Sequence, residues 1–429
     1  MKLNYKRTIL VGFAFFVITA FWGAYDAIVP KILTNLFNME QWASGIVMSL
    51  DNVFALFMLP IFGGLSDKVK FKSGKRTPFI FVGIILAALC FAGLGLIRDA
   101  GMLILFIFVL LLTLVSMSIF RSPAVALMPD VTVKPLRSKG NAIINLMGTA
   151  GGIIVLVFGI LFKTGAAGKT DFAAYSIAIS ILMVVGLIAF LLFVNEPKWA
   201  KEMQAESEKL GLEKSEAEVA NTVKRKLTRS ELVSLILILA SVALWYTGYN
   251  AVTSKYSVYA EEVLKVDFNT TLIVAQAAAV VAYIPVGIIS SKIGRKKSIL
   301  AGVLMLTVAF TIGIFLKEVK SEVYMFPIFA LAGIGWATIN VNSFPMAVEL
   351  AKVGDVGKYT GYYYTASMAA QIITPVLSGA LVSLFDWWIF FPYAAVFTGL
   401  SFITMLFVKH GDSRPERKGA LESLAGAED

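Results

Sequence analysis

Twelve apolar stretches, each about 20 residues long, limit the folds that this chain can adopt. A helix of about 20 residues crosses the hydrocarbon core of a bilayer. Only 15% of the 429 residues are charged and 58% are hydrophobic, whereas about 25% of the residues in a soluble domain are charged. We therefore predict an all-α membrane protein with twelve transmembrane helices. The stretches are 9–31, 42–64, 78–97, 102–128, 141–163, 172–194, 231–253, 270–290, 297–316, 323–346, 358–384 and 388–408.

The distribution of basic residues predicts the topology. If the N-terminus is cytoplasmic, 29 of the 38 Lys and Arg residues fall in cytoplasmic segments, as the positive-inside rule requires. We expect a multi-pass protein of the plasma membrane with both termini in the cytoplasm. The net charge of +10 then reflects topology and anionic lipid rather than nucleic acid. The first stretch is too long for a signal peptide and is expected to be retained.

One long polar segment divides the chain. Residues 195–230 follow six spans and precede six, and their mixed Glu and Lys residues predict a solvated cytoplasmic linker that is partly helical. We expect a six-helix bundle at 1–194, the linker at 195–230, a second six-helix bundle at 231–410 and a cytoplasmic tail at 411–429.

The two halves carry related patterns in the same order. FWGAYDAIV in span one matches LWYTGYNAVT in span seven, so that Asp26 corresponds to Asn250. Asp51 and Gln276 each stand nine residues before a proline, in spans two and eight. Span four ends with FRSPAVALMPD and then reaches a basic loop and Gly140, and span ten ends with NSFPMAVEL and then reaches Gly361. These pairs predict a parallel duplication with pseudo-symmetric bundles, an architecture that places a transporter's binding site between the halves near the midplane.

Ionisable residues within the spans are concentrated in the first half. A charged side chain at the centre of a bilayer costs about 2.5–3.5 kcal/mol and usually marks a functional site. Our hypothesis is that Asp26 or Asp51 carries a coupled proton, with Arg121 as the counter-ion. The alternatives are a static Asp26–Arg121 pair and packing of Asp51 against Asn52.

Aromatic rings beside hydrogen-bonding groups predict a site for a sugar, whose C–H faces stack on rings while its hydroxyls bind polar groups. The alternative functions of these residues are anchoring at the membrane interface and bonding between helices. The candidate substrate-binding residues are Trp22, Tyr25, Asp26, Trp245, Tyr249, Asn250, Gln276, Asn340 and Asn342.

The loop GGLSDKVKFKSGKRTPFI between spans two and three resembles the signature loop of the major facilitator superfamily. Its Thr-Pro-Phe ending, and FRSPAVALMPDVTVKPLRSKGNA at 120–142, resemble the glycoside:cation symporters, most closely the sucrose/maltose:proton branch. The resemblance covers spans one to five. The loop positions that match, and that we expect to act in gating, are Gly63, Asp67, Gly74, Lys75 and Arg76. We expect Asp67 to lie against the N-terminus of a neighbouring helix, where the macrodipole favours an anion.

The resemblance implies the major facilitator fold and proton-coupled import of a maltose- or sucrose-like disaccharide by alternating access. It assigns Asp130 to coupling, although Asp130 could also cap a helix or pair with Arg137. Sodium-coupled relatives carry paired Asp residues in span two where this chain has Ala55 and Leu59, which favours protons over sodium and predicts no other cofactor.

Other classes of function find less support in the sequence. A proton-antiport exporter of drugs or metabolites is the main alternative, and a non-transporting sensor or scaffold is another. With one His and one Cys, the chain offers neither an intrachain disulfide nor a His-based metal site, and we expect neither an enzyme nor a nucleotide-binding protein. We expect the chain to work as a monomer in the lipid bilayer. The glycines of span five are expected to let helices approach closely.

Overall fold

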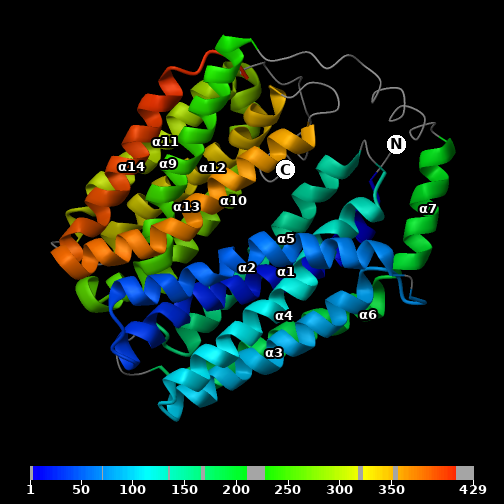
Figure 1. Cartoon of the computed structure of the whole chain (residues 1–429), viewed down its shortest axis with the longest axis horizontal. Coiled ribbons are helices and arrows are strands. Elements are labelled where there is room, and N and C mark those ends of the chain that lie inside the picture. Colours follow the sequence, from blue (N-terminus) through cyan, green and yellow to red (C-terminus); the bar gives the residue numbers. More distant parts are fainter. Residues whose placement is uncertain are drawn as a thin grey trace. The chain divides into compact units, whose positions relative to one another are not determined.

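The computed structural model describes residues 3–69, 71–133, 136–165, 170–209, 228–316, 322–350 and 356–411. Within these ranges it contains twelve helices that are long and apolar enough to cross a membrane, which confirms the twelve predicted spans (Figure 1). They are α1 (Tyr5–Lys31), α2 (Gln41–Lys68), α3 (Thr77–Asp99), α4 (Leu103–Asp130), α5 (Arg137–Leu161), α6 (Phe172–Phe193), α9 (Arg229–Tyr259), α10 (Phe268–Ile293), α11 (Arg295–Gly313), α12 (Phe326–Glu349), α13 (Val356–Phe385) and α14 (Phe390–Leu406).

Short helical elements extend or join these spans. The α7 helix (Glu196–Lys209) occupies the start of the predicted linker, and residues 210–227 of that linker lie outside the described ranges. Two π-helical turns, η1 (Ile32–Leu36) and η3 (Ala260–Leu264), prolong α1 and α9. Two 3₁₀ turns, η5 (Glu322–Met325) and η6 (Trp387–Ile389), precede α12 and α14.

The chain forms two compact units that do not follow the order of the sequence strictly. Unit 1 comprises Met1–Met39, Leu50–Leu210 and Ala260–Thr270. Unit 2 comprises Glu40–Ser49, Gly211–Tyr259 and Thr271–Asp429. Each unit therefore includes a short segment from the other half of the chain. In both cases the segment lies where the first two spans of that other half are joined.

Unit 1 is built around α1. This helix packs against α5, α6 and α4, while α3 packs against α4 and α6. Buried aromatic side chains fill the space between α1 and α3, where the rings of Phe21 and Phe91 have centroids 5.4 Å apart. Close packing of α1 on α5 depends on small residues, because a Cβ atom at Gly151 would lie 2.4 Å from the carbonyl oxygen of Phe16. The predicted role of the span-five glycines is confirmed at this position.

Unit 2 repeats the arrangement with α9 at its centre. The α9 helix packs against α14 and α13, and α11 packs against α12 and α14. Gly248 of α9 allows the close approach to α14, since a Cβ atom there would lie 2.8 Å from the carbonyl oxygen of Ala394. The ring of Tyr259, near the end of α9, stacks on Phe390 of α14 with centroids 4.7 Å apart.

The backbone confirms the internal duplication. In each half the first span ends in a π-helical turn, which is followed by a residue with positive φ, Asn38 at 50° and Lys265 at 57°. The same backbone hydrogen bond closes both turns, from Met39 N to the Leu33 carbonyl and from Val266 N to the Ala260 carbonyl. The next span begins three residues after the positive-φ residue in both halves. The two halves are thus pseudo-symmetric bundles.

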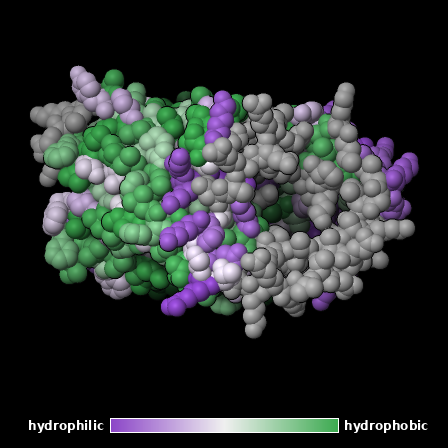
Figure 2. Space-filling view, turned by 90° about the horizontal axis from the view of Figure 1, so that it is seen from above, coloured by the Kyte–Doolittle hydropathy of each residue, from purple (hydrophilic) through white to green (hydrophobic). Residues whose placement is uncertain are grey.

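Large apolar side chains cover much of the surface of the spans. Figure 2 shows hydrophobic residues over a broad part of one face, next to a band of hydrophilic residues. Side chains such as Ile104, Leu192 and Leu384 are exposed although they lie in apolar helices. A helix that exposes apolar side chains in this way is suited to contact with lipid tails, as expected for a multi-pass membrane protein.

We predict that Gly151→Ala destabilises the protein. The added methyl group forces α1 and α5 apart at Phe16, and overpacking of this kind costs about 1–3 kcal/mol. Gly93→Ala in α3 is the matched control, because a Cβ atom there has no neighbour within 4 Å and alanine favours a helix by about 0.5–1 kcal/mol. Thermal unfolding in detergent measures both variants. Equal melting temperatures would contradict the packing argument.

Candidate functional site

Asp26 lies in the C-terminal third of α1, five residues before the end of the helix, and its side chain is exposed although Tyr25 and Ala27 on either side are buried. Trp22 lies one helical turn before it, so that the two side chains share a face of α1. An exposed carboxylate inside a membrane span must face protein or water rather than lipid. Asp26 therefore marks a polar surface of unit 1 that faces protein or water.

Asp51 and Arg121 lie close to Asp26. Asp51, in α2, interacts electrostatically with both Asp26 and Arg121. Its Oδ1 also accepts a hydrogen bond of 2.6 Å from the side-chain amide of Asn52, which is the packing contact that the sequence leaves open as an alternative. The guanidinium carbon of Arg121 lies 5.4 Å from the centroid of the Trp22 ring. Three helices of unit 1 thus bring two carboxylates, one guanidinium and one indole together. We call these four residues the Asp26 group.

Two polar atoms near the Asp26 group have no hydrogen-bond partner. They are Nε1 of Trp22 and the hydroxyl of Tyr25, and both atoms are buried. The Tyr25 ring is fully buried and packs against Phe21 and Trp22. Its hydroxyl group, rather than the face of its ring, is therefore the part that could contact a ligand. Buried donors without a partner are costly, and at a candidate binding site they indicate positions that a polar ligand could satisfy.

Unit 2 contains an aromatic group on α9 and α12. The rings of Tyr249 and Trp336 are parallel within 2°, with centroids 3.6 Å apart. Tyr246 meets the edge of the same indole at 5.3 Å. Beside Tyr249 in the chain, Nδ2 of Asn250 is buried without a hydrogen-bond partner. Trp336 is not among the residues that the sequence patterns single out, although its place in GIGWATINVN of the tenth span could have drawn attention to it.

Trp245 differs from Trp22 in its surroundings. Its side chain is fully buried, and its Nε1, like that of Trp22, has no hydrogen-bond partner, so its role in substrate binding stays a prediction. Trp245 shares a helical face with Ser241 and Gly248, which pack against α14: Ser241 Oγ lies 2.7 Å from Thr404 Oγ1. Tyr246, Tyr249 and Asn250 lie on an adjacent part of the helix. The repeat with Trp22 therefore holds in sequence but not in exposure.

The other polar residues predicted to bind substrate in the second half differ in how deeply they are buried. Gln276 of α10 and Asn340 of α12 are half-buried. Asn342 is buried, and its amide donates to the carbonyl of Thr338 one turn earlier at 2.9 Å. The amide of Asn342 thus donates within its own helix, and its role in substrate binding stays a prediction.

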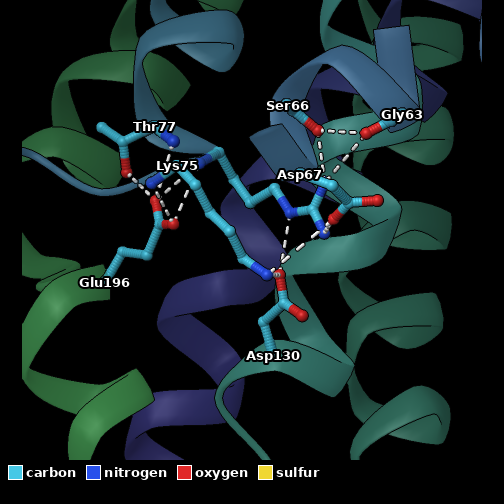
Figure 3. Close-up of polar contacts among 8 residues, drawn as sticks. Gly63, Ser66, Asp67, Lys75, Thr77, Asp130 and Glu196 are labelled. Carbon is cyan, nitrogen blue, oxygen red and sulfur yellow. Dashed lines mark hydrogen bonds and ion pairs between the residues drawn. The ribbon is translucent and has the colours of Figure 1, made fainter. Parts of the chain in front are cut away.

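The loop between α2 and α3 is organised around Arg76, which is 4% exposed. Its Nε donates to Asp130 at 2.8 Å, and its Nη2 pairs with Asp67. Its Nη1 contacts Ser66 Oγ and the carbonyl of Gly63. Lys75 adds a second cation, 3.2 Å from Asp130. We call Gly63, Ser66, Asp67, Lys75, Arg76, Asp130 and Glu196 the Arg76 cluster (Figure 3).

Glu196, the first residue of α7, caps the N-terminus of α3. Its carboxylate accepts hydrogen bonds from the backbone N–H groups of Lys75, Arg76 and Thr77 at 2.7–3.1 Å, and from the Thr77 hydroxyl at 2.7 Å. Such an anion satisfies the free N–H groups of a helix start and complements its dipole. Gly74 is required here, because its φ is 114° and a Cβ atom would collide with the Glu196 carboxylate.

This arrangement corrects the prediction for Asp67, and the coupling role of Asp130 stays a prediction. The carboxylate at the helix N-terminus is Glu196, whereas Asp67 binds the Arg76 side chain instead. Asp130 does not share the Asp26 group but belongs to the Arg76 cluster. The side chain of Arg137, the other partner considered for Asp130, lies outside the described side chains. The sequence signal for Glu196 is its position in Asn-Glu-Pro-Lys directly after the sixth span, within a segment whose composition predicts a solvated linker.

The second half carries a counterpart of the Arg76–Asp130 pair. Arg295 pairs with Glu349 at the end of α12, and its Nη1 also donates to the carbonyl of Pro345 at 3.3 Å. Arg76 and Asp130 are separated by 54 residues, and so are Arg295 and Glu349. Glycines with positive φ, Gly74 and Gly294, precede the two arginines. Among the described residues, no group of three or more His, Cys, Asp or Glu could hold a metal ion.

Comparison with known proteins identifies the family. A sequence model of the MFS/sugar transport protein family matches residues 10–387, and the chain belongs to this family. It is 24% identical over 412 residues to an uncharacterised MFS-type transporter of Methanocaldococcus jannaschii, covering 94% of this chain and 95% of that protein. The chain is therefore a sugar or solute transporter of the major facilitator superfamily rather than an enzyme.

Solved transporters share the fold. The inward-open xylose transporter XylE from E. coli superimposes with a TM-score of 0.71 and 13% identity, covering 98% of this chain and 99% of that chain. A point mutant of the nucleoside transporter NupG gives a TM-score of 0.66 and 14% identity, covering 94% of this chain and 100% of that chain. At these identities the likeness concerns the fold.

We predict that Glu196→Gln destabilises the protein by about 1–3 kcal/mol, because buried N–H groups at the start of α3 lose a charged acceptor. Glu202→Gln on the same helix is the matched control. Glu202 forms an exposed ion pair with Arg7, and such pairs contribute about 0–1 kcal/mol. Thermal unfolding in detergent compares the two variants. A loss of stability in Glu202→Gln as large as that in Glu196→Gln would contradict the capping role.

Proposed function

We propose that the chain is a proton-coupled importer of a disaccharide, a maltose- or sucrose-like glucoside. We also propose that it works as a monomer in the plasma membrane with both termini in the cytoplasm. The observation that carries the proposal is the Asp26 group: an exposed carboxylate within a span, in electrostatic range of a second carboxylate and an arginine.

Proton coupling follows from the charges of this group. Two carboxylates within electrostatic range repel each other when both are ionised, and binding one proton relieves that repulsion. Arg121 can neutralise only one of them at a time. Binding of a proton and of a neutral substrate can thus be linked through the same few side chains.

Polar and aromatic groups in each unit support a sugar as the substrate. Asp26 and the free donors of Trp22 and Tyr25 offer hydrogen bonds to hydroxyl groups in unit 1. In unit 2, the stacked rings of Tyr249 and Trp336 stand beside the unpartnered amide of Asn250. A lipophilic cation would need the rings and the carboxylate but would leave the amide and indole donors unsatisfied. The family description as sugar transport agrees with this interpretation.

Uptake into liposomes tests the substrate and the direction. Purified protein is reconstituted, an inward proton gradient is imposed, and uptake of maltose, sucrose, trehalose, lactose and glucose is measured with and without a protonophore. We expect one disaccharide to accumulate and the accumulation to collapse with the protonophore. If no sugar enters while a pH gradient drives extrusion of a lipophilic dye, the protein is an exporter instead and the proposal is wrong.

Neutral variants test the coupling residues. We expect Asp26→Asn or Asp51→Asn to reduce proton-driven accumulation to the equilibrium level while exchange of sugar across the membrane continues. The matched control is Asp99→Asn, because Asp99 is an exposed carboxylate at the end of α3 that pairs with Arg98. The control should accumulate sugar like the unaltered protein. Full accumulation in both Asp26→Asn and Asp51→Asn would exclude this group as the proton site.

A further inference from the structure

Lys31, the last residue of α1, is 2% exposed and has three kinds of partner. Its Nζ donates to the carbonyl of Thr164, which follows α5, and forms an ion pair with Glu261 of η3. The same Nζ lies 5.4 Å from the centroid of the Phe268 ring. Glu261 and Phe268 come from the second half of the chain, so this lysine joins segments that are far apart in the sequence.

The segment Ala260–Thr270, which belongs to unit 1, contacts the first half of the chain around Lys31. Nδ2 of Asn269 donates to Thr164 Oγ1 at 2.9 Å. Two glycines leave room for the segment: a Cβ atom at Gly159 would collide with the Asn269 amide, and one at Gly165 would collide with Asp267. The loop between the seventh and eighth spans therefore fits closely against the ends of α1 and α5.

Lys255 of α9 has the corresponding position in unit 2. It follows Asn250 by five residues, as Lys31 follows Asp26 by five, and it is also 2% exposed. Its Nζ donates to the backbone carbonyl of Gln41 at 2.9 Å and to the Gln41 side chain at 3.3 Å. Gln41 is the first residue of α2 and belongs to the first half of the chain.

The start of α2 fits closely against α13 as well. A Cβ atom at Gly379 would lie 2.3 Å from the carbonyl oxygen of Gln41, and one at Gly45 would lie 2.1 Å from that of Pro375. A short segment of the first half, Glu40–Ser49, thus belongs to unit 2, and Ala260–Thr270 of the second half belongs to unit 1. Lys255 contacts the former segment and Lys31 contacts the latter. These contacts lie at the end of α2 opposite to the Arg76 cluster.

We propose that Lys31 and Lys255 are a pseudo-symmetric pair of latches that close the outer gate of the transporter. The inference rests on the cytoplasmic termini of the proposed function, which place these contacts on the outer side. Alternating access requires the two halves to separate on that side in every cycle. Separation must part the Lys31 ammonium group from Glu261 and the Lys255 ammonium group from Gln41, so the two lysines set the stability of the outward-closed state.

Thiol labelling tests the latches without a sugar or a proton gradient. In a Cys90→Ala background, Asp26→Cys provides a single reporter in the exposed position of α1. An impermeant thiol reagent is added to the outer side of oriented vesicles. We expect Lys31→Gln combined with Lys255→Gln to raise the labelling rate by about tenfold or more, because an unpaired buried Glu261 destabilises the closed state. Lys265→Gln is the matched control, since Lys265 is an exposed lysine in the same loop and should leave the rate unchanged.

A cross-link provides an independent test that does not depend on the lysine variants folding. Thr164→Cys with Asn269→Cys places two thiols where the side chains now touch at 2.9 Å. Thr307→Cys with Thr398→Cys is the control pair, at 3.1 Å between α11 and α14 of the same half. We expect oxidation of the first pair, but not of the second, to abolish the slow labelling of the Asp26→Cys reporter from outside, with reversal by a reductant.

Two results would overturn the proposal. The first is a labelling rate in the double lysine variant equal to that of Lys265→Gln. The second is unchanged outside labelling after the Thr164–Asn269 pair is cross-linked. Neither result would bear on whether a proton or a sugar is carried, because the reporter measures access alone. Conversely, failure of uptake in the liposome experiment would leave the labelling result intact.

Discussion

The absence of water from the bilayer core is the constraint on which the rest of this structure depends. Backbone groups must be satisfied within the spans, which leaves helices as the solution for an apolar chain of this kind. Ionisable side chains face the same requirement. Arg76, Lys31 and Lys255 are each nearly inaccessible, and each meets carboxylates or carbonyl oxygens at the end of a span. Polar interactions are therefore concentrated at the helix ends and in the Asp26 group, and the lipid-facing surface remains apolar.

The duplication distributes these interactions unequally. Both halves keep an arginine paired with a carboxylate 54 residues later, and both keep a lysine five residues after the central polar residue. The central residue itself differs, because an Asp in the first half corresponds to an Asn in the second. Glu196 adds a carboxylate that links α7 to the loop before α3. One half has thus retained charge in its centre, whereas the other has retained amides and aromatic rings.

Much of the fold could be predicted from the sequence, since hydrophobic length alone locates the spans and each helix begins within a few residues of its predicted position. Pairwise detail within a span could not be predicted. Trp245 matches Trp22 in the repeat, yet a difference of helical face buries it against α14. The roles of Asp67 and Glu196 could not be told apart, because the choice between them depends on how α7 folds back, which no local pattern records. The hydrogen bond from the Asn342 amide to its own helix could not be predicted either, because a buried amide can bond to its own helix as readily as to a substrate.

The reciprocal placement of the two loop segments also has a consequence for biosynthesis. The first six spans emerge from the ribosome before residues 260–270 have been made, so Lys31 enters the membrane without Glu261 and Phe268. Its long aliphatic stem can extend the ammonium group to the interfacial region during this period. Folding of the first bundle is then complete only after the eighth span has been inserted. A chain truncated before residue 260 would lack the contacts of Lys31 with Glu261 and Phe268.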